Sequence, residues 1–297
     1  MNGLLSIVTE PLAFDFMRRA LAVAVIVGAV CAVLSCFLVL KGWSLMGDAV
    51  SHAVLPGIVL AFLLGLPLAV GAFAAGLASA VATGYLKEMS RVKEDTVMGI
   101  VFSGMFGFGL VLFTKVDTEQ HLTHILFGDV LGVTSGDLFE TVLIGGLVLA
   151  VVLAKRRDLL LYCFDPQHAR AIGIDVRVLH YGLLVMLALT IVTALKAVGI
   201  ILVVAMLVGP GATAYLVARR FETMLGVALG VAIASSVIGT LLSFHIDGAT
   251  GPTIVLVQLG AFLIAFLRRM VATYLTTAEI SPGPTSERRS DPRAAIK

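Results

Sequence analysis

The sequence predicts an all-α polytopic membrane protein with about eight or nine transmembrane helices, some of them broken. Hydrophobic residues make up 59% of the 297 residues and charged residues only 13%, whereas a soluble domain carries about 25% charged residues. The mean hydropathy is +1.04. One water-facing core cannot hide that much apolar surface, so lipid must solvate much of it.

Runs that are free or nearly free of charge supply the predicted spans, each of which needs roughly 20 apolar residues. The run 53–86 is too long for one helix, and Gly65-Leu66-Pro67 marks a turn that divides it in two. The other runs are 20–40, 96–114, 141–154, 178–195, 197–218, 223–244 and 248–267. About nine segments result.

Three regions follow one another along the chain. Residues 1–19 are an amphipathic lead-in, residues 20–269 a single transmembrane domain, and residues 270–297 a cytoplasmic tail. The tail is rich in proline, serine and charge, so we expect it to be disordered. The first apolar run, Ala20 to Leu40, has the length of a full span, so we expect no cleavable signal peptide.

The positions of the basic residues predict the orientation. With Arg268-Arg269 on the cytoplasmic side, loop 155–177 is also inside and the segment 245–247 is outside. Continuing to the N-terminus places Arg18-Arg19 outside, against the rule. Either the number of spans is odd, or one of the first three segments does not span fully.

Several classes of function are excluded by what the sequence lacks. It has no phosphate-binding loop of the Gly-x-x-x-x-Gly-Lys-Ser/Thr type, no His-Glu-x-x-His and no nucleophile elbow. No basic stripe of the nucleic-acid-binding kind is present. Cys31, Cys36 and Cys163 do not form a metal or redox motif and are interpreted as small apolar residues. We therefore expect neither an enzyme nor a nucleic-acid-binding protein.

One stretch in the apolar part of the chain carries both a carboxylate and an imidazole. Asp48 and His52 are four residues apart and share one face of a helix. Pro56-Gly57 follows within about a turn and is expected to break or kink this helix. Ionisable side chains in hydrocarbon are costly and mark functional sites. A carboxylate with an imidazole and no thiolate suits manganese, iron or zinc.

Each of these two residues also has a structural interpretation. Asp48 can cap a helix that begins at Ala49. His52 can form a hydrogen bond between helices. Capping and metal binding are compatible, because an aspartate at a helix start has a second oxygen.

Further candidates lie elsewhere along the chain. His245 and Asp247 stand at the outer end of a span, as a gate pair or an ordinary interfacial loop, and His121 and His124 share a helical face or are simply solvated. The segment Gly209-Pro210-Gly211 interrupts a span or kinks it.

The cytoplasmic loop contains a short predicted helix. Asp165 can cap it, Pro166 can occupy its first position and Gly173 can end it. Such a helix either docks on a partner or connects two spans in solvent.

Segment 48–57 resembles the signature of the permease subunits of ABC importers for manganese, zinc and iron(II), the ABC-3 family. The resemblance runs from about Phe14 to Leu267, and residues 121–132 are most similar to the manganese/iron branch. Further stretches that agree are 94–102, 126–128, 164–173, 209–214 and 251–256.

The resemblance implies an importer in the bacterial cytoplasmic (inner) membrane that carries manganese(II), iron(II) or zinc(II), with no bound cofactor of its own. It implies three protein partners: a cytoplasmic ATP-binding subunit dimer, a periplasmic or surface metal-binding protein, and a second permease, identical or homologous. Asp48 and His52 match the positions that carry metal. The residues assigned to the ATPase-coupling helix are Asp165, Pro166, Ala169, Ala171 and Gly173.

An alternative function belongs to a different class. A stand-alone secondary transporter driven by protons would use Asp48 and His52 as a proton relay. The missing phosphate-binding loop fits both functions, whereas the capped cytoplasmic helix favours a docked ATPase.

Overall fold

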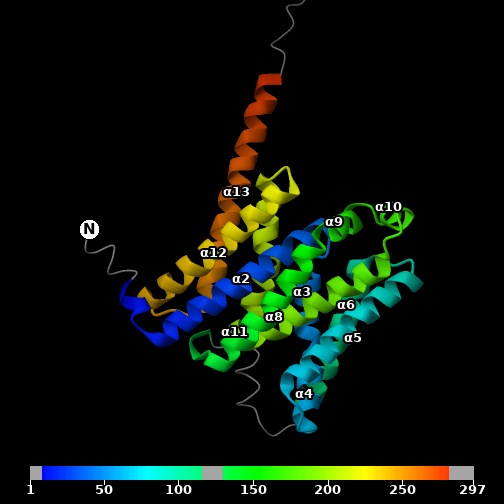
Figure 1. Cartoon of the computed structure of the whole chain (residues 1–297), viewed down its shortest axis with the longest axis vertical. Helices are drawn as coiled ribbons and strands as arrows, with labels where there is room; N and C mark the ends of the chain where they lie inside the picture. Colours follow the sequence, from blue (N-terminus) through cyan, green and yellow to red (C-terminus); the bar gives the residue numbers. More distant parts are fainter. Residues whose placement is uncertain (1–8, 116–129, 281–297) are drawn as a thin grey trace, which may run out of the picture.

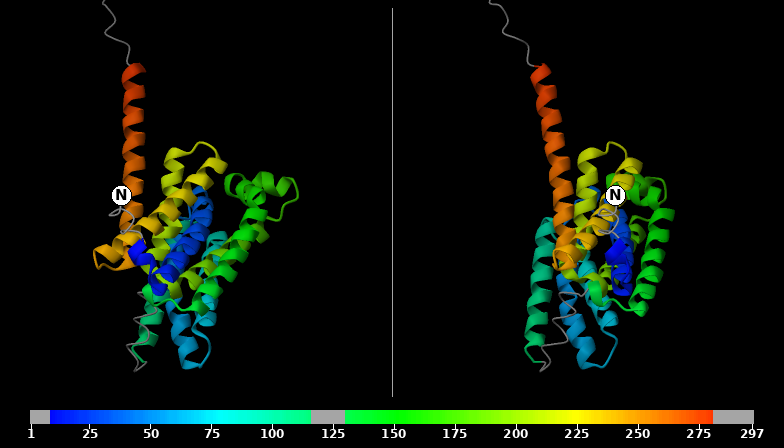
Figure 2. Two further views of the ribbon diagram at one scale, coloured as in Figure 1. Left: turned by 60° about the vertical axis from the view of Figure 1, so that its left-hand side comes forward. Right: turned by 90° about the vertical axis from the view of Figure 1, so that its left-hand side faces the viewer.

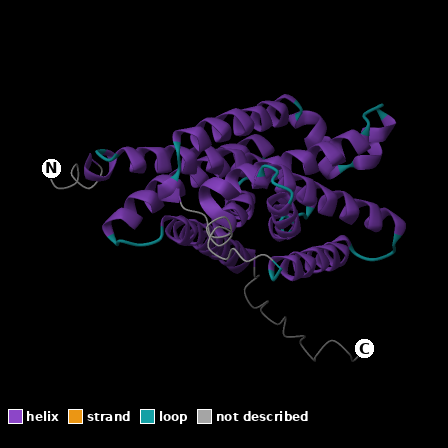
Figure 3. Ribbon diagram, turned by 90° about the horizontal axis from the view of Figure 1, so that it is seen from below, coloured by secondary structure: helices purple, strands orange, loops and turns teal. Residues whose placement is uncertain are grey.

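The computed structural model describes residues 9–115 and 130–280, and Figure 3 shows helices joined by short loops. No strand occurs in these two stretches, which confirms the all-α prediction. The helices are α2 (Asp15–Lys41), α3 (Met46–Ala53), α4 (Leu55–Leu63), α5 (Leu68–Met89), α6 (Glu94–Phe113), a 3-10 turn η1 (Val130–Gly132), α8 (Ser135–Ala154), α9 (Arg156–Phe164), α10 (Pro166–Ala171), α11 (Val176–Val217), α12 (Phe221–His245) and α13 (Thr250–Ile280).

The number of spans agrees with the prediction. In the described part, eight helical stretches are long and apolar enough to cross a membrane, and a shorter apolar helix covers Leu202–Val217. The predicted turn after the second span is also present, because α4 ends at Leu63 and α5 begins at Leu68. Gly65 between them has φ 67°, a left-handed conformation that glycine adopts without strain.

Helix α2 is the central helix of the bundle (Figure 1). It packs against α8, α9, α11 and α12, and Val23, Cys31 and Phe37 along it are fully buried. A helix that is apolar on every side is suited to this enclosed position. Cys31 and Cys36 are buried free thiols, as expected for small apolar residues.

Helix α11 reverses direction at Gly199, whose φ of 77° and ψ of 167° are not helical. His180 lies beside Trp43, just past the C-terminal end of α2, and Gly211 donates its N–H to Ser35 in the same half of α2. Residues 180 and 211 of a straight helix would be roughly 45 Å apart. The two predicted spans 178–195 and 197–218 are therefore separate segments, and Gly199 divides them.

The predicted interruption at Gly209-Pro210-Gly211 is wrong, because the helix continues through Pro210. The Ser35 hydroxyl accepts a hydrogen bond from the N–H of Gly211 (3.0 Å) and donates one to the carbonyl of Val208 (3.2 Å). A proline inside a helix removes one backbone hydrogen bond and disturbs its neighbours. Ser35 gives the backbone beside Pro210 a partner and so helps the helix to persist.

The two ends of α2 lie at opposite ends of the molecule. At its start, Phe14 contacts Phe244 near the turn between α12 and α13, with ring centroids 6.0 Å apart. At its end, the ammonium of Lys41 lies 4.1 Å from the ring centroid of Tyr162 in α9. Arg18-Arg19 are thus at the end opposite α9 and α10. The eight long apolar helices and the shorter helix Leu202–Val217 make nine apolar segments in the described part. Such an odd number, one of the two predicted alternatives, gives this arrangement.

The predicted region boundaries are displaced at both ends. Helix α2 begins at Asp15, so the end of the lead-in 1–19 is part of the first helix. Helix α13 continues to Ile280 and projects beyond the other helices (Figure 2). Residues 270–280 are therefore helical rather than disordered. The rest of the predicted tail, 281–297, lies outside the described residues.

Candidate functional site

Asp48 and His52 face each other on α3. The Nε2 atom of His52 lies 3.4 Å from Oδ1 of Asp48, and their side chains are 32% and 44% exposed, respectively. The prediction that they share one helical face is confirmed. Both residues belong to the apolar stretch Met46–Leu63, which is long enough to cross a membrane.

Neither structural role predicted for the pair, helix capping by Asp48 or an interhelical hydrogen bond from His52, is found in the structure. Helix α3 begins at Met46, two positions before Asp48, so Asp48 is inside the first turn and does not cap a helix at Ala49. The ring of His52 lies against Phe102 and Phe106 of α6, at centroid distances of 5.4 and 5.3 Å. These are aromatic contacts, and no hydrogen bond joins His52 to another helix in the described ranges. Apart from their contact with each other, the side chains of Asp48 and His52 have no polar partner among the described residues, so a ligand can reach them.

The break after α3 is set by Pro56 and by two close helix contacts. Val54 joins α3 to α4, and Pro56 occupies the first turn of α4. A Cβ added at Gly57 would lie 2.0 Å from the carbonyl oxygen of Gly71 in α5, and one added at Gly109 in α6 would lie 2.9 Å from Pro56. Only glycine permits such close approach of backbones. The predicted break is confirmed, and Gly57 is explained by helix packing.

Helix α3 also packs against the second half of α11. A Cβ at Gly47 would lie 3.1 Å from the side chain of Leu207. The hydroxyl of Ser51 donates to the carbonyl of Gly47 at 2.7 Å, within the same helix. The face of α3 that carries Gly47 and Ser51 is thus packed against protein. Asp48 and His52 lie about 100° further round the helix and are partly exposed.

The other metal candidates do not join this pair. His245 bonds through Nδ1 to the carbonyl of Leu241 in its own helix (2.8 Å), and Asp247 has φ 50° in the turn after α12. Helix α12 packs on α2, α11 and α13, whereas α3 packs on α4, α5, α6 and α11. His121 and His124 lie outside the described residues. Within the described residues, no group of three or more His, Cys, Asp or Glu side chains could hold a metal.

The short helix in the cytoplasmic loop has the predicted caps. The carboxylate of Asp165 accepts hydrogen bonds from the N–H groups of Gln167 (3.0 Å) and His168 (2.9 Å), and Pro166 is the first residue of α10. Gly173 follows with φ 87°. Ala169 is fully buried in the hydrophobic core, so only Ala171 of the two alanines is at the surface. Ala169 anchors α10 to the spans.

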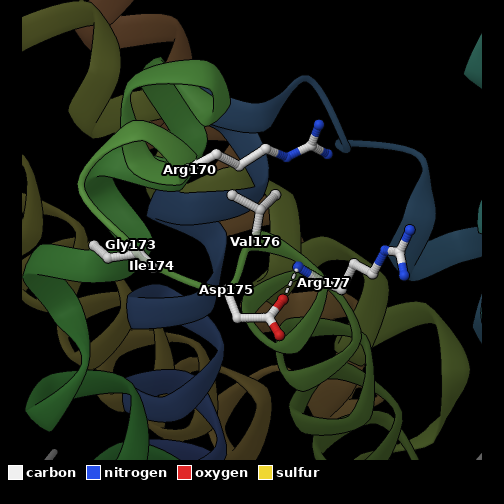
Figure 4. Close-up of a pocket in the computed structure, with 6 residues that line it drawn as sticks. All are labelled: Arg170, Gly173, Ile174, Asp175, Val176 and Arg177. Atoms are coloured by element: carbon white, nitrogen blue, oxygen red, sulfur yellow. Dashed lines mark hydrogen bonds between the residues drawn. The ribbon is translucent and has the colours of Figure 1, made fainter.

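An open hollow of about 510 Å³ lies between α10 and the start of α11. Figure 4 shows Arg170 and Arg177 extending to the same side of it. Asp175 turns its carboxylate to the N–H groups of Arg177 and Val178, at 2.9 and 3.3 Å, and caps α11. The side chains of Arg170 and Arg177 make no ion pair with a described residue. The hollow is therefore positively charged.

Sequence reasoning missed the residues that complete the surroundings of the pair. Phe102 and Phe106 form the aromatic wall against His52, with their own centroids 6.3 Å apart. Their spacing of four residues in a predicted span was a usable signal, because such residues lie on one helical face. The contact between Gly57 and Gly71 had no comparable local signal.

Comparison with known proteins assigns the chain to a family. Residues 13–269 match the ABC 3 transport family. A chelated iron transport system membrane protein of Yersinia pestis, YfeD, is 63% identical over 90% of this chain and 90% of its own length. A manganese transport system membrane protein of Synechocystis, MntB, is 53% identical over 87% of this chain and 84% of its own.

A solved structure is similar in fold as well as in sequence. PsaBC from Streptococcus pneumoniae, solved in complex with a Fab, superimposes with a TM-score of 0.79 and 40% sequence identity. The match covers 89% of this chain and 95% of the other. Together with the eight apolar helices, these matches show that the chain is a multi-pass membrane protein that belongs to the ABC 3 transport family.

Proposed function

We propose that this chain is the permease subunit of an ABC importer in the bacterial cytoplasmic membrane, and that it carries manganese(II) or iron(II). The relatives named for iron and manganese transport support these two ions. Zinc belongs to the proposal on ligand chemistry alone, because carboxylate and imidazole also bind zinc. The chain itself performs no bond chemistry, and a separate ATP-binding subunit hydrolyses ATP.

The face formed by Asp48 and His52 is the proposed cargo pathway. Their side chains lie 3.4 Å apart and remain partly exposed inside an apolar span, which supports this assignment. Two ligands do not complete the coordination of a divalent metal. The ion must take its other ligands from water or from another subunit. Incomplete coordination also suits a pathway, since a transported ion must be released again.

The exposure of this face supports a second permease subunit as a partner. Asp48 is 44% exposed, and Leu45 just before α3 is 58% exposed. A carboxylate that faced lipid at this position would be costly. In the described part, only 17% of the span in α6, which borders the pair, is buried, compared with 72% of that in α2. A second subunit, identical or homologous, would cover this side and enclose the ion between the two chains.

Helix α10 is the proposed docking site for the ATP-binding subunit. It lies outside the spans, is held by buried Ala169 and presents the hollow with Arg170 and Arg177. Guanidinium groups form bidentate hydrogen bonds with carboxylates. We expect acidic side chains of the ATP-binding subunit to occupy this hollow. A metal-binding protein on the opposite side of the membrane would deliver the ion and supply most of its selectivity.

Reconstitution in liposomes tests the function. The chain, its second permease and the ATP-binding subunit are inserted together, and the metal-binding protein is added on the side opposite the ATP-binding subunit. Uptake of manganese or iron(II) is followed with an enclosed fluorescent chelator. We expect uptake only with ATP and the ATP-binding subunit, and no effect of a proton ionophore. Uptake by the chain alone under a proton gradient, without ATP, would instead establish the stand-alone secondary transporter.

Charge reversal tests the docking surface separately. The double variant Arg170→Glu with Arg177→Glu should lose co-purification of the ATP-binding subunit while the chain still inserts. Arg91→Glu, at an exposed position of the α5–α6 connection, is the matched control and should keep the subunit. If both proteins retain it equally, the hollow is not the docking contact.

A further inference from the structure

Three aromatic side chains from three separate segments meet near the end of the molecule that carries α10. The Oη atom of Tyr162 in α9 lies 2.8 Å from Nδ1 of His180 in α11, within hydrogen-bond distance. The ring of His180 meets the indole of Trp43 nearly at a right angle, with centroids 5.2 Å apart. Trp43 lies in the connection between α2 and α3 and is only 2% exposed.

The backbone of Trp43 is fastened to the start of α3. Its N–H donates to the carbonyl of Leu38 at 2.8 Å, and its carbonyl accepts from the N–H of Met46 at 3.0 Å. Met46 is the first residue of α3, and Asp48 belongs to the first turn. A displacement of the buried indole therefore displaces the turn that carries Asp48.

Tyr162 is likewise linked to α10 through backbone hydrogen bonds. It lies in α9, and the N–H of Asp165 donates to the carbonyl of Leu161 at 2.8 Å, so the cap of α10 continues directly from α9. Helices α9 and α10 also pack on each other. A partner that moves α10 therefore moves Tyr162 with it.

The imidazole of His180, between Trp43 and Tyr162, is closely packed and has little space in which to move. A Cβ added at Gly84 in α5 would lie 3.0 Å from Nε2 of His180, so α5 closes the side away from Tyr162. The ammonium of Lys41 covers the Tyr162 ring at 4.1 Å. Close-packed interiors transmit displacement rather than absorb it.

Close packing alone does not explain why this cluster contains polar atoms. A hydrogen bond between tyrosine and histidine adds little net stability over an apolar pair of the same shape. The indole Nε1 of Trp43 is buried and donates to none of the described residues. A cluster that only filled space would need neither group. A hydrogen bond does fix the relative position of α9 and α11, which apolar contact alone does not.

We propose that Trp43, His180 and Tyr162 are positioning residues that link movement of α10 to the position of Asp48 on α3. The proposal rests on the proposed function, because it takes the ATP-binding subunit as the partner that moves α10. The three residues touch no cargo. They set how far α3 moves when ATP closes the ATP-binding dimer, and so how many ions are carried per ATP.

Tyr162→Phe is the main test, because it removes one oxygen and keeps the ring under Lys41. In the reconstituted complex, the ATP-binding subunit should still co-purify and hydrolyse ATP within about twofold of the wild type. Ions imported per ATP should fall roughly threefold to thirtyfold, the range for residues that couple two sites. Tyr85→Phe, on an exposed tyrosine of α5, is the matched control and should leave this ratio unchanged.

Variants of His180 separate positioning from packing. His180→Leu should lower ions per ATP by a similar factor, and adding Tyr162→Phe to it should lower the ratio no further, since both changes remove the same hydrogen bond. His180→Asn places an amide oxygen near the position of Nδ1 and should recover part of the loss. Full additivity, or no recovery with asparagine, would overturn the link.

The outcomes also separate this inference from the proposed function. If the wild-type complex is driven by ATP but Tyr162→Phe keeps a normal ion-to-ATP ratio, only the positioning role fails. If Tyr162→Phe loses assembly, hydrolysis and transport together, the cluster is merely structural and the proposal is wrong. If the wild-type chain imports metal without an ATP-binding subunit, the proposed function fails and the positioning role fails with it.

Discussion

Helices α3 and α10 each carry an aspartate close to their start, and the two carboxylates are used in opposite ways. Asp165 accepts two backbone hydrogen bonds at the start of α10, at 3.0 and 2.9 Å. Asp48 caps nothing in the described chain, faces His52 at 3.4 Å and remains 44% exposed. A carboxylate whose oxygens are taken up by its own backbone holds a fold together. A carboxylate whose oxygens are not bonded to the backbone can bind a cation.

The same contrast separates two serines near these sites. The hydroxyl of Ser35 joins α2 to α11 beside Pro210. The hydroxyl of Ser51, next to His52, is bonded to Gly47 within α3. One hydroxyl connects two helices, and the other only adds to a helix that is already formed. The hydrogen-bond partner, rather than the residue type, indicates what each side chain contributes.

The same substitution at both aspartates should have opposite results. Asparagine caps helices about as well as aspartate, so Asp165→Asn should leave metal uptake within about twofold of the wild type. Asp48→Asn keeps the size but removes the charge that a divalent ion requires, and should lower uptake more than about 100-fold, beyond the loss typical of residues around a metal site. Uptake is measured in cells or liposomes with equal amounts of inserted protein.

Equal uptake by the two variants would contradict these different roles for the two carboxylates. Wild-type uptake with Asp48→Asn would remove this residue from the cargo pathway. His52→Gln is the companion variant and should follow Asp48→Asn, with the ATP-binding subunit still co-purifying from both. Loss of that subunit would indicate a folding defect in place of a lost ligand.

The parts of the fold that sequence reasoning found are those fixed by local rules. The aspartate–proline start of α10 and its glycine end depend on residues within one turn, and the structure has each of them. The spacing of Asp48 and His52 is equally local. The number of spans follows from apolar length alone.

The parts that sequence reasoning missed depend on contacts between distant segments. A proline between two glycines signals a break, but Ser35, on another helix, provides partners for the backbone there. The reversal occurs instead at Gly199, close to the predicted boundary between the spans 178–195 and 197–218. Sequence reasoning also took Ala169 for a docking contact, because burial against the chain's own core has no local signature.

Ser35→Ala should have the next largest effect, on stability. It leaves the N–H of Gly211 without the serine oxygen in a buried position, which costs about 1–3 kcal/mol. We expect a lower midpoint of thermal unfolding for the purified protein in detergent, by several degrees. Ser35→Thr keeps the hydroxyl, but its extra methyl would crowd Gly211, where a Cβ would already lie 2.4 Å from the serine oxygen. An unchanged midpoint in Ser35→Ala would show that the Ser35 hydroxyl does not stabilise the helix at Pro210.

Asp165→Ala should have a smaller and more local effect. Loss of a side-chain cap costs about 0.5–2 kcal/mol of helix stability, and α10 has only six residues to resist it. Co-purification of the ATP-binding subunit should weaken roughly twofold to thirtyfold, with the thermal midpoint of the spans unchanged. Asp165→Asn is the matched control and should restore binding. Equal binding by Asp165→Ala would mean that the partner recognises this segment without a preformed helix.

Ser51→Ala should have the smallest effect, although Ser51 is next to His52 and belongs to the same short segment as both candidate ligands. Its side chain is fully buried, and its hydroxyl bonds to the carbonyl of Gly47 one turn earlier, at 2.7 Å. Such bonds to the preceding turn add little to a helix and often bend it slightly. Alanine also favours helix more than serine does. Metal uptake should therefore stay within about twofold of the wild type, measured beside Asp48→Asn at equal expression. A loss as large as that of Asp48→Asn would mean that the hydroxyl turns from Gly47 to the ion during transport, and that a bonded side chain can still serve as a ligand.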